Sequence, residues 1–271
     1  FPDLTVDGSF PLGGAVCAVL ISTGTNPYVA TLAATAAGAV AGLITGWLNV
    51  KLKIMDLLAS ILMMIALYSV NLRIMGKPNV PLISEPTVFS LLQPEWMPDY
   101  VFRPVLLGVV VVIVKLLVDW FFSTQVGLSL RATGANPRMA RAQGVATGAA
   151  TLAGMALSNA LVALAGALYA QTQGGADVSM GIGTIVIGLA AVIIGETVLP
   201  ARRLVLTTLA VVIGAILYRF FIALALNSDF IGLQAQDLNM VTAALVVIAL
   251  VLPGVRRKVF GRLAKTATKG N

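Results

Sequence analysis

Long apolar runs dominate this chain, and they restrict it to folds that a lipid bilayer can accommodate. Two of them, Phe102–Phe122 and Ala146–Ala170, reach the length of about 20 residues that an α-helix needs to cross a hydrocarbon layer about 30 Å thick. The sequence is 58% hydrophobic and only 11% charged. Because a helix satisfies its own backbone hydrogen bonds inside lipid, residues 1–271 are expected to form a single all-α, polytopic transmembrane helical bundle.

The apolar segments alternate with polar connections, and the first segment is short for a full crossing. They cover approximately residues 10–23, 28–49, 54–74, 102–122, 146–170, 181–199, 204–226 and 239–253. Thirteen of the 18 Lys and Arg residues fall in alternate connections, on one side of the membrane if every segment spans: Lys51, Lys53, Arg131, Arg138, Arg141, Arg202, Arg203, Arg256, Arg257, Lys258, Arg262, Lys265 and Lys269. An excess of Lys and Arg marks the cytoplasmic side. The connection 123–145 and the C-terminus, with its basic tail 254–271, are therefore expected in the cytoplasm.

The chain lacks the sequence motifs of several common enzyme classes. The chain has no histidine and one cysteine, Cys17, which excludes a Ser-His-Asp triad and a Cys/His metal site. It has no phosphate-binding G-x-x-x-x-G-K-[ST] loop, no G-x-S-x-G elbow and no H-E-x-x-H motif. The net charge of +7 does not indicate nucleic-acid binding, because the basic residues sit at membrane edges without interleaved aromatics. No catalytic residue, bound metal or nucleic-acid partner is expected.

The cytoplasmic connection 123–145 carries signals for a short helix. Asn136 suits the N-cap, Pro137 fits the first helical position, and Gly144 suits a left-handed stop. These signals predict about two helical turns over Pro137–Gln143.

Two cations of this short helix, Arg138 and Arg141, are expected on one face because they stand three residues apart. A two-turn helix is not stable alone in water. We therefore expect the helix to be held against a protein surface on the cytoplasmic side.

The N-terminal stretch Phe1–Gly14 places two acids, Asp3 and Asp7, before an apolar run interrupted by Pro11 and two glycines. Transporters expose backbone groups to cargo in segments that are short or interrupted by Gly and Pro. A second short, Gly-rich run, Gly181–Glu196, is a candidate counterpart. The alternative for the two acids is a solvated helix start, where carboxylates complement the helix dipole.

Two polar residues inside or at the end of apolar runs allow more than one role. Asn159 can bond a neighbouring helix or a substrate, and packing is favoured. Glu196 ends its run close to Arg202 and Arg203, so an ion pair at the membrane edge is favoured over contact with cargo.

Two further patterns concern packing. Gly38, Gly42 and Gly46 repeat every four residues, which permits close helix contact within one subunit or between two copies. Lys115 lies mid-run with Asp119 one turn later, so the two can neutralise each other.

The connection Gly76–Tyr100 contains five prolines and has too many breaks to be a span. Its apolar residues Phe89–Leu92 and Trp96 are expected to rest at the lipid interface, where tryptophan is favoured. The alternative is part of a docking surface for an external partner.

Four stretches resemble the membrane subunits of bacterial ABC importers, in the branched-chain amino acid and ribose permease family. They are DLTVDGSFPLGG (Asp3–Gly14), GLSLRATGANPRMARAQGV (Gly127–Val145), LSNALVALAGALYAQTQGGADVSMGIG (Leu157–Gly183) and IGLAAVIIGE (Ile187–Glu196). The resemblance implies a type II importer-like bundle with broken or re-entrant segments, in the bacterial plasma (inner) membrane. It is greatest to tryptophan/tyrosine-type permeases, so an amino-acid cargo, aromatic by preference, is expected. Such permeases usually begin with one more apolar helix, so an N-terminal helix is expected to be missing from this chain.

The resemblance also implies partners and site residues. The cytoplasmic segment would be a coupling element that docks into an ABC ATPase subunit, through Arg131, Gly134, Asn136, Pro137, Arg138, Ala140, Arg141 and Gly144. The partner ATPase would bind ATP and Mg, with no cofactor in this chain. A second permease copy, in a homodimer, and an extracytoplasmic substrate-binding protein complete the expected complex.

The cargo path is expected to include Asp7, Ser9 and Phe10, with Asp3, Asn159 and Glu196 as further candidates. A secondary, ion-coupled transporter without an ATPase remains the alternative, and a lipid-active membrane enzyme is a third. Dependence of transport on an ATP-hydrolysing partner separates the first two.

Overall fold

The computed structural model describes residues 3–94, 98–200, 203–226 and 247. The chain divides into unit 1, Phe1–Thr184, and unit 2, Ile185–Asn271. Five helices of the described residues are long and apolar enough to cross a membrane. They are α2 (Pro27–Val50), α3 (Asp56–Met75), α5 (Asp99–Ser123), α8 (Thr147–Gln173) and α10 (Leu204–Leu226). The expected all-α polytopic bundle is confirmed. Apart from Val247, the predicted segment 239–253 lies outside the described residues, as do the tail 254–271 and Trp96.

The first helix, α1 (Val6–Ser22), is short and continues through Pro11 without a break. Its glycines do not interrupt the helix but allow it to pack closely against α8. A Cβ atom at Gly13 would lie 2.0 Å from the carbonyl oxygen of Ala163 on α8. From the other side of the contact, a Cβ at Gly166 would lie 2.0 Å from the carbonyl oxygen of Phe10. The glycines that suggested an interrupted helix therefore let α1 and α8 touch.

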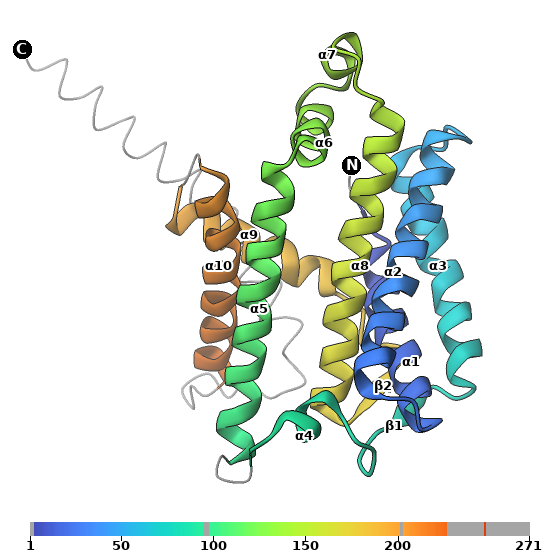
Figure 1. The fold of residues 1–271 in the computed structure, drawn as a ribbon, viewed down its shortest axis with the longest axis vertical. Helices are drawn as coiled ribbons and strands as arrows, with labels where there is room; N and C mark the ends of the chain where they lie inside the picture. Colours follow the sequence, from blue (N-terminus) through green and yellow to red (C-terminus); the bar gives the residue numbers. More distant parts are fainter. Residues whose placement is uncertain (1–2, 95–97, 201–202, 227–246, 248–271) are drawn as a thin grey trace, which may run out of the picture. The chain divides into compact units, whose positions relative to one another are not determined.

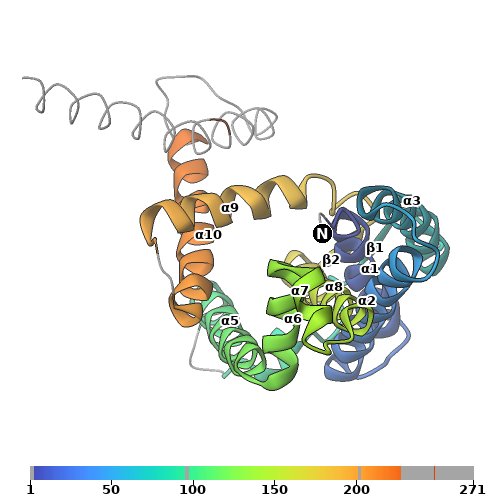
Figure 2. The ribbon, with the colours of Figure 1, turned by 90° about the horizontal axis from the view of Figure 1, so that it is seen from above.

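Helices α2 and α8 lie side by side in both views of the ribbon (Figures 1 and 2). The glycine repeat of α2 faces α8. A Cβ at Gly42 would lie 2.1 Å from the carbonyl oxygen of Met155, and one at Gly38 would lie 2.4 Å from that of Asn159. Of the two alternatives for this repeat, the structure supports contact within one subunit.

Small side chains fill the space where α1, α2 and α8 meet. The buried cluster includes Ala15, Cys17, Ala18, Ala30, Ala34, Ala167 and Ala170. Since lipid tails are as apolar as the core, helices in a membrane associate through such close van der Waals packing and through hydrogen bonds.

One end of unit 1 carries a small sheet that the sequence did not predict. Strands β1 (Asn79–Pro81) and β2 (Gly175–Asp177) pair antiparallel, with Val80 opposite Ala176. The short helix α4 (Val88–Leu92) follows, and the Val88 amide donates a hydrogen bond of 2.8 Å to Gln171 Oε1 on α8. Phe89 is only 3% exposed. The expectation that Phe89 rests on lipid is wrong, because α4 is tied to α8 and buries this ring.

The opposite end of unit 1 carries α6 (Gln125–Ala135) and α7 (Pro137–Ala142) (Figure 1). The connection with Lys51 and Lys53 lies at this end too, as the charge pattern predicts. One cavity is lined by Asn49 and Asp56, which flank that connection, and by Arg141 of α7.

Helix α5 carries the predicted ion pair between Lys115 and Asp119. The ammonium donates to the carboxylate one turn later, and both side chains are largely shielded. This pairing explains how two charges are tolerated in an apolar helix.

Unit 2 begins with most of α9 (Thr184–Val198) and continues with α10. These two helices also approach closely at glycines. A Cβ at Gly214 would lie 1.9 Å from the carbonyl oxygen of Ala191, and one at Gly195 would lie 2.1 Å from that of Ala210. Tyr218 is fully buried against this contact.

We predict that Gly42→Ala destabilises the protein by about 1–3 kcal/mol, because the added methyl group overpacks the backbone of α8. The matched control is Gly108→Ala on α5, where a Cβ meets nothing within 4 Å. Thermal unfolding in detergent can be followed by reaction of a thiol-specific dye with Cys17, which is buried. Equal melting temperatures for the two variants would contradict the packing role of Gly42.

Candidate functional site

The short helix α7 has the capping geometry that its sequence predicts. Asn136 Oδ1 accepts a hydrogen bond of 3.1 Å from the Met139 amide, and Pro137 occupies the first helical position. The helix ends one residue earlier than predicted, with Gln143 as its C-cap. Gly144 follows with φ of +84°, a left-handed conformation that favours glycine. The connection is therefore an ordered helix–turn element rather than a loose loop.

The two arginines of α7 have different surroundings. Arg141 donates to the hydroxyl of Thr147, the first residue of α8, with Nη2–Oγ1 and Nε–Oγ1 distances of 3.0 and 3.4 Å. Arg138 is exposed and has no ion pair within the described part of the chain. Arg141 thus fastens α7 to α8, while Arg138 is available at the surface.

The other predicted coupling residues differ in their exposure. Arg131 and Gly134 of α6 are exposed, whereas Ala140 is buried. Met139 is also exposed, at 64%. An apolar side chain beside a cation is typical of a surface that contacts another protein.

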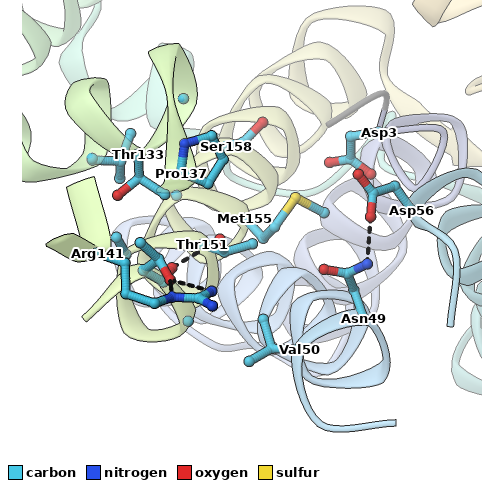
Figure 3. A pocket seen from close by; sticks show the side chains of 16 residues that line it. Asp3, Asn49, Val50, Asp56, Thr133, Pro137, Arg141, Thr151, Met155 and Ser158 are labelled. Carbon is cyan, nitrogen blue, oxygen red and sulfur yellow. Dashed lines mark hydrogen bonds between the residues drawn. The ribbon is translucent and has the colours of Figure 1, made fainter. Parts of the chain in front are cut away.

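A cavity of about 590 Å³ lies between the α6–α7 element and the ends of α2, α3 and α8. Its polar wall includes Asp3, Asn49, Asp56, Thr133, Arg141, Thr147 and Thr151. In Figure 3, Arg141 and Asp3 lie on opposite sides, with Met155 and Thr151 between them. The cavity therefore extends from the predicted coupling element to Asp3, which precedes α1.

Asp3 continues this connection into the bundle. Its Oδ2 accepts a hydrogen bond of 2.8 Å from Asn159 Nδ2, and Asn159 Oδ1 accepts one of 2.6 Å from the Ser9 hydroxyl. Asn159 Nδ2 also donates to the carbonyl oxygen of Met155, at 3.1 Å. These contacts match the favoured packing role of Asn159. Its role toward cargo stays a prediction, as does that of Ser9.

The remaining cargo candidates are Asp7 and Phe10 in unit 1 and Glu196 in unit 2. Asp7 Oδ1 accepts a hydrogen bond of 2.7 Å from the Thr184 hydroxyl. The ring of Phe10 packs against that of Tyr169 at a centroid distance of 5.5 Å. Glu196 is exposed in unit 2, and the described residues include no ion pair between it and Arg203. Arg202, its other expected partner, lies outside the described residues.

Several buried polar residues were missed by the sequence reasoning, among them Gln171, Thr31 and Asn71. Gln171 Nε2 donates a hydrogen bond of 2.9 Å to the Thr31 hydroxyl, and this bond joins α8 to α2. Asn71 Nδ2 donates a hydrogen bond of 3.1 Å to the carbonyl oxygen of Gly8, and this bond joins α3 to α1. The sequence signal for Gln171 and Asn71 is an amide side chain inside an apolar run, since such groups need hydrogen-bond partners in lipid. The sequence analysis applied this signal only to Asn159.

Comparison with known proteins places this bundle in a family. The family model described as "Branched-chain amino acid transport system / permease component" matches residues 1–252. The chain is 40% identical over 255 residues to a protein of Clostridioides difficile (strain R20291) named "Tyrosine transport system permease protein", covering 94% of this chain and 82% of that protein.

A second relative extends the comparison. The chain is 35% identical over 181 residues to an uncharacterized protein of Rickettsia prowazekii (strain Madrid E), covering 67% of this chain and 62% of that protein. No solved structure matches the chain. The matched family spans nearly all of the helices described above, so this multi-pass membrane protein belongs to the family of permease components of branched-chain amino acid transport systems.

Proposed function

We propose that this chain is the permease subunit of an ATP-driven (ABC) importer that carries an aromatic amino acid. The observation that carries the coupling part is the capped helix α7, fastened to the start of α8 by Arg141 and exposing Arg138 and Met139 beside it. The cargo class is supported by the 40% identity to a tyrosine transport system permease protein. In this proposal the end with α6 and α7 faces the cytoplasm, as does the C-terminus.

The proposed complex contains two copies of this chain, two cytoplasmic ATPases and an extracytoplasmic binding protein. ATP and Mg bind to the ATPases and need no cofactor in this chain. ATP can drive transport only by binding more tightly to one state of the complex than to another. The ATPase therefore has to move α7 when it closes, and α7 has to pass that movement into the bundle.

A chain of direct contacts supports this transmission. Arg141 holds the start of α8, and α8 packs on the glycines of α2 and α1. Halfway along α8, Asn159 bonds Ser9 and Asp3. Movement of α7 can thus reach α1 through packed backbone and hydrogen bonds. The cavity of about 590 Å³ beside this route leaves room for α6 and α7 to move relative to the helix ends.

The deciding experiment asks whether an ATPase co-purifies with the native, full-length protein in mild detergent and in lipid nanodiscs. We expect a stoichiometric ATPase, and we expect it to be lost when residues 137–143 are replaced by a Gly/Ser linker. Its absence from the native preparation, together with amino-acid uptake driven by an ion gradient, would contradict the proposal. A secondary transporter would then be the better explanation.

We predict that Arg138→Glu weakens the association with the ATPase by about tenfold or more, because charge reversal in an interface creates repulsion. Lys51→Glu is the matched control, since it reverses an exposed charge at the same end of unit 1 but on another connection. The measurement is the affinity of the purified ATPase for permease in nanodiscs. Equal weakening by both variants would assign the effect to overall charge rather than to α7.

A third prediction concerns the cap of α7. Asn136→Ala removes the acceptor for the Met139 amide and should destabilise the helix by about 1 kcal/mol. Transport-coupled ATP hydrolysis should fall, and Asn136→Asp should restore it because aspartate also caps. Failure of Asn136→Asp to restore coupling would show that the amide group itself, rather than the cap, is needed.

A further inference from the structure

A second cavity, of about 440 Å³, lies in unit 1 between α1, α3 and the segment that follows β2. It shares no lining residue with the cavity beside α7. Its volume is within the range of about 300–1,000 Å³ that small-molecule sites usually have. None of its lining residues belongs to the proposed coupling route.

One wall of this cavity holds a buried oxygen without a partner. Asn71 is fully buried on α3 and lines the cavity. Its Nδ2 donates to the carbonyl oxygen of Gly8 at 3.1 Å, which fixes the orientation of the amide, because a reversed amide would oppose two acceptors. Asn71 Oδ1 then accepts no hydrogen bond from the described residues. Since buried polar atoms nearly always have a partner, this oxygen points to a donor supplied by a bound molecule.

The cavity also contains one formal charge, and it is negative. Asp7 lines it from α1, with its carboxylate oriented by the Thr184 hydroxyl at 2.7 Å and the Gly183 amide at 3.4 Å. The described lining includes no lysine or arginine. A carboxylate has about four lone-pair sites, so Asp7 has the capacity to accept from a ligand donor besides its partners within the protein. The polar groups therefore favour a ligand that is cationic and rich in N–H donors.

The rest of the lining is mainly apolar. Pro11 contributes from α1, and Met64, Ile65 and Tyr68 contribute from α3. An aromatic or aliphatic side chain can pack against this surface, and the Tyr68 ring can also attract a cation.

We propose that this cavity binds the α-ammonium group of an amino-acid cargo. Asp7 and Asn71 Oδ1 accept hydrogen bonds from the ammonium, and the cargo side chain packs against the wall that Pro11, Met64 and Tyr68 form. The inference rests on the proposed function for the amino-acid class of the cargo. It adds which end of that cargo this chain recognises, and with which residues.

The test is equilibrium binding of tritiated L-tyrosine to the full-length protein in nanodiscs, with two competitors. Tyramine keeps the ammonium and lacks the carboxylate, whereas N-acetyl-L-tyrosine lacks the ammonium. We expect tyramine to compete and N-acetyl-L-tyrosine not to compete. Asp7→Asn and Asn71→Leu should each weaken tyrosine binding by about tenfold or more, the usual effect of removing a hydrogen bond to a charged group.

Asp99→Asn is the matched control, because it removes a carboxylate that is exposed at the start of α5 and paired with Arg103. Slow reaction of Cys17 with a thiol dye shows that each variant is folded. If Asn71→Leu fails this check, Asp7→Asn, which keeps the size of the side chain, decides the question. Unchanged tyrosine binding in folded Asp7→Asn would overturn the inference, and so would competition by N-acetyl-L-tyrosine as strong as that by tyramine.

ATP-dependent tyrosine uptake in proteoliposomes separates this inference from the proposed function. Uptake by the wild type, with binding unaffected by either substitution, refutes the ammonium site and leaves the importer intact. Absence of ATP-dependent uptake of tyrosine or any other amino acid refutes the proposed function, and the ammonium site with it.

Discussion

The close approach of α8 to its two neighbours is the constraint on which the rest of unit 1 depends. Gly42 and Gly38 let α2 touch the backbone of α8, and Gly13 and Gly166 let α1 do the same. In a bilayer, moving an apolar side chain from lipid to protein gains little, so helices are held together by contact distance and hydrogen bonds. A larger residue at these positions would separate the helices and also pull apart the polar groups between them.

Those polar groups form two clusters at different depths along α8. In one, Asn159 of α8 joins Ser9 of α1. In the other, Gln171 of α8 donates to Thr31 of α2 and to the sulfur of Cys17 of α1. A buried polar group is costly unless it is paired, so each cluster penalises any sliding of one helix along another. The glycines set how close the helices come, and the amides set their register.

Sequence patterns predicted most of the helices and the local form of α7, because the relevant signals are local. Asn136, Pro137 and Gly144 act within a few residues of each other, and hydropathy alone marks a span. The small sheet was missed because its three-residue strands are stabilised by pairing between segments almost 100 residues apart, Asn79 with Asp177. The sequence also suggested a break in α1, since Pro11 and nearby glycines favour one. Only the position of Ala163 on α8 explains why α1 needs glycine at position 13. Likewise, an unpaired oxygen on Asn71 depends on what surrounds it in space, which no local pattern encodes.

The two ends of unit 1 differ in how firmly they are joined. At one end, paired strands and the Val88–Gln171 hydrogen bond tie α8 to its neighbours. At the other end, a cavity of about 590 Å³ lies beside α7, which Arg141 joins to Thr147 at the start of α8. Because α2 packs on α8 as far as Met155, a movement at the α7 end would tilt these helices together about the tied end. Helix α8 has 27 residues and is therefore about 40 Å long, so a tilt of about 5° about its tied end displaces the end beside α7 by about 3.5 Å. The same tilt moves residues near the tied end by only a fraction of an ångström. A large displacement of α7 therefore leaves the packing around Gln171 almost undisturbed.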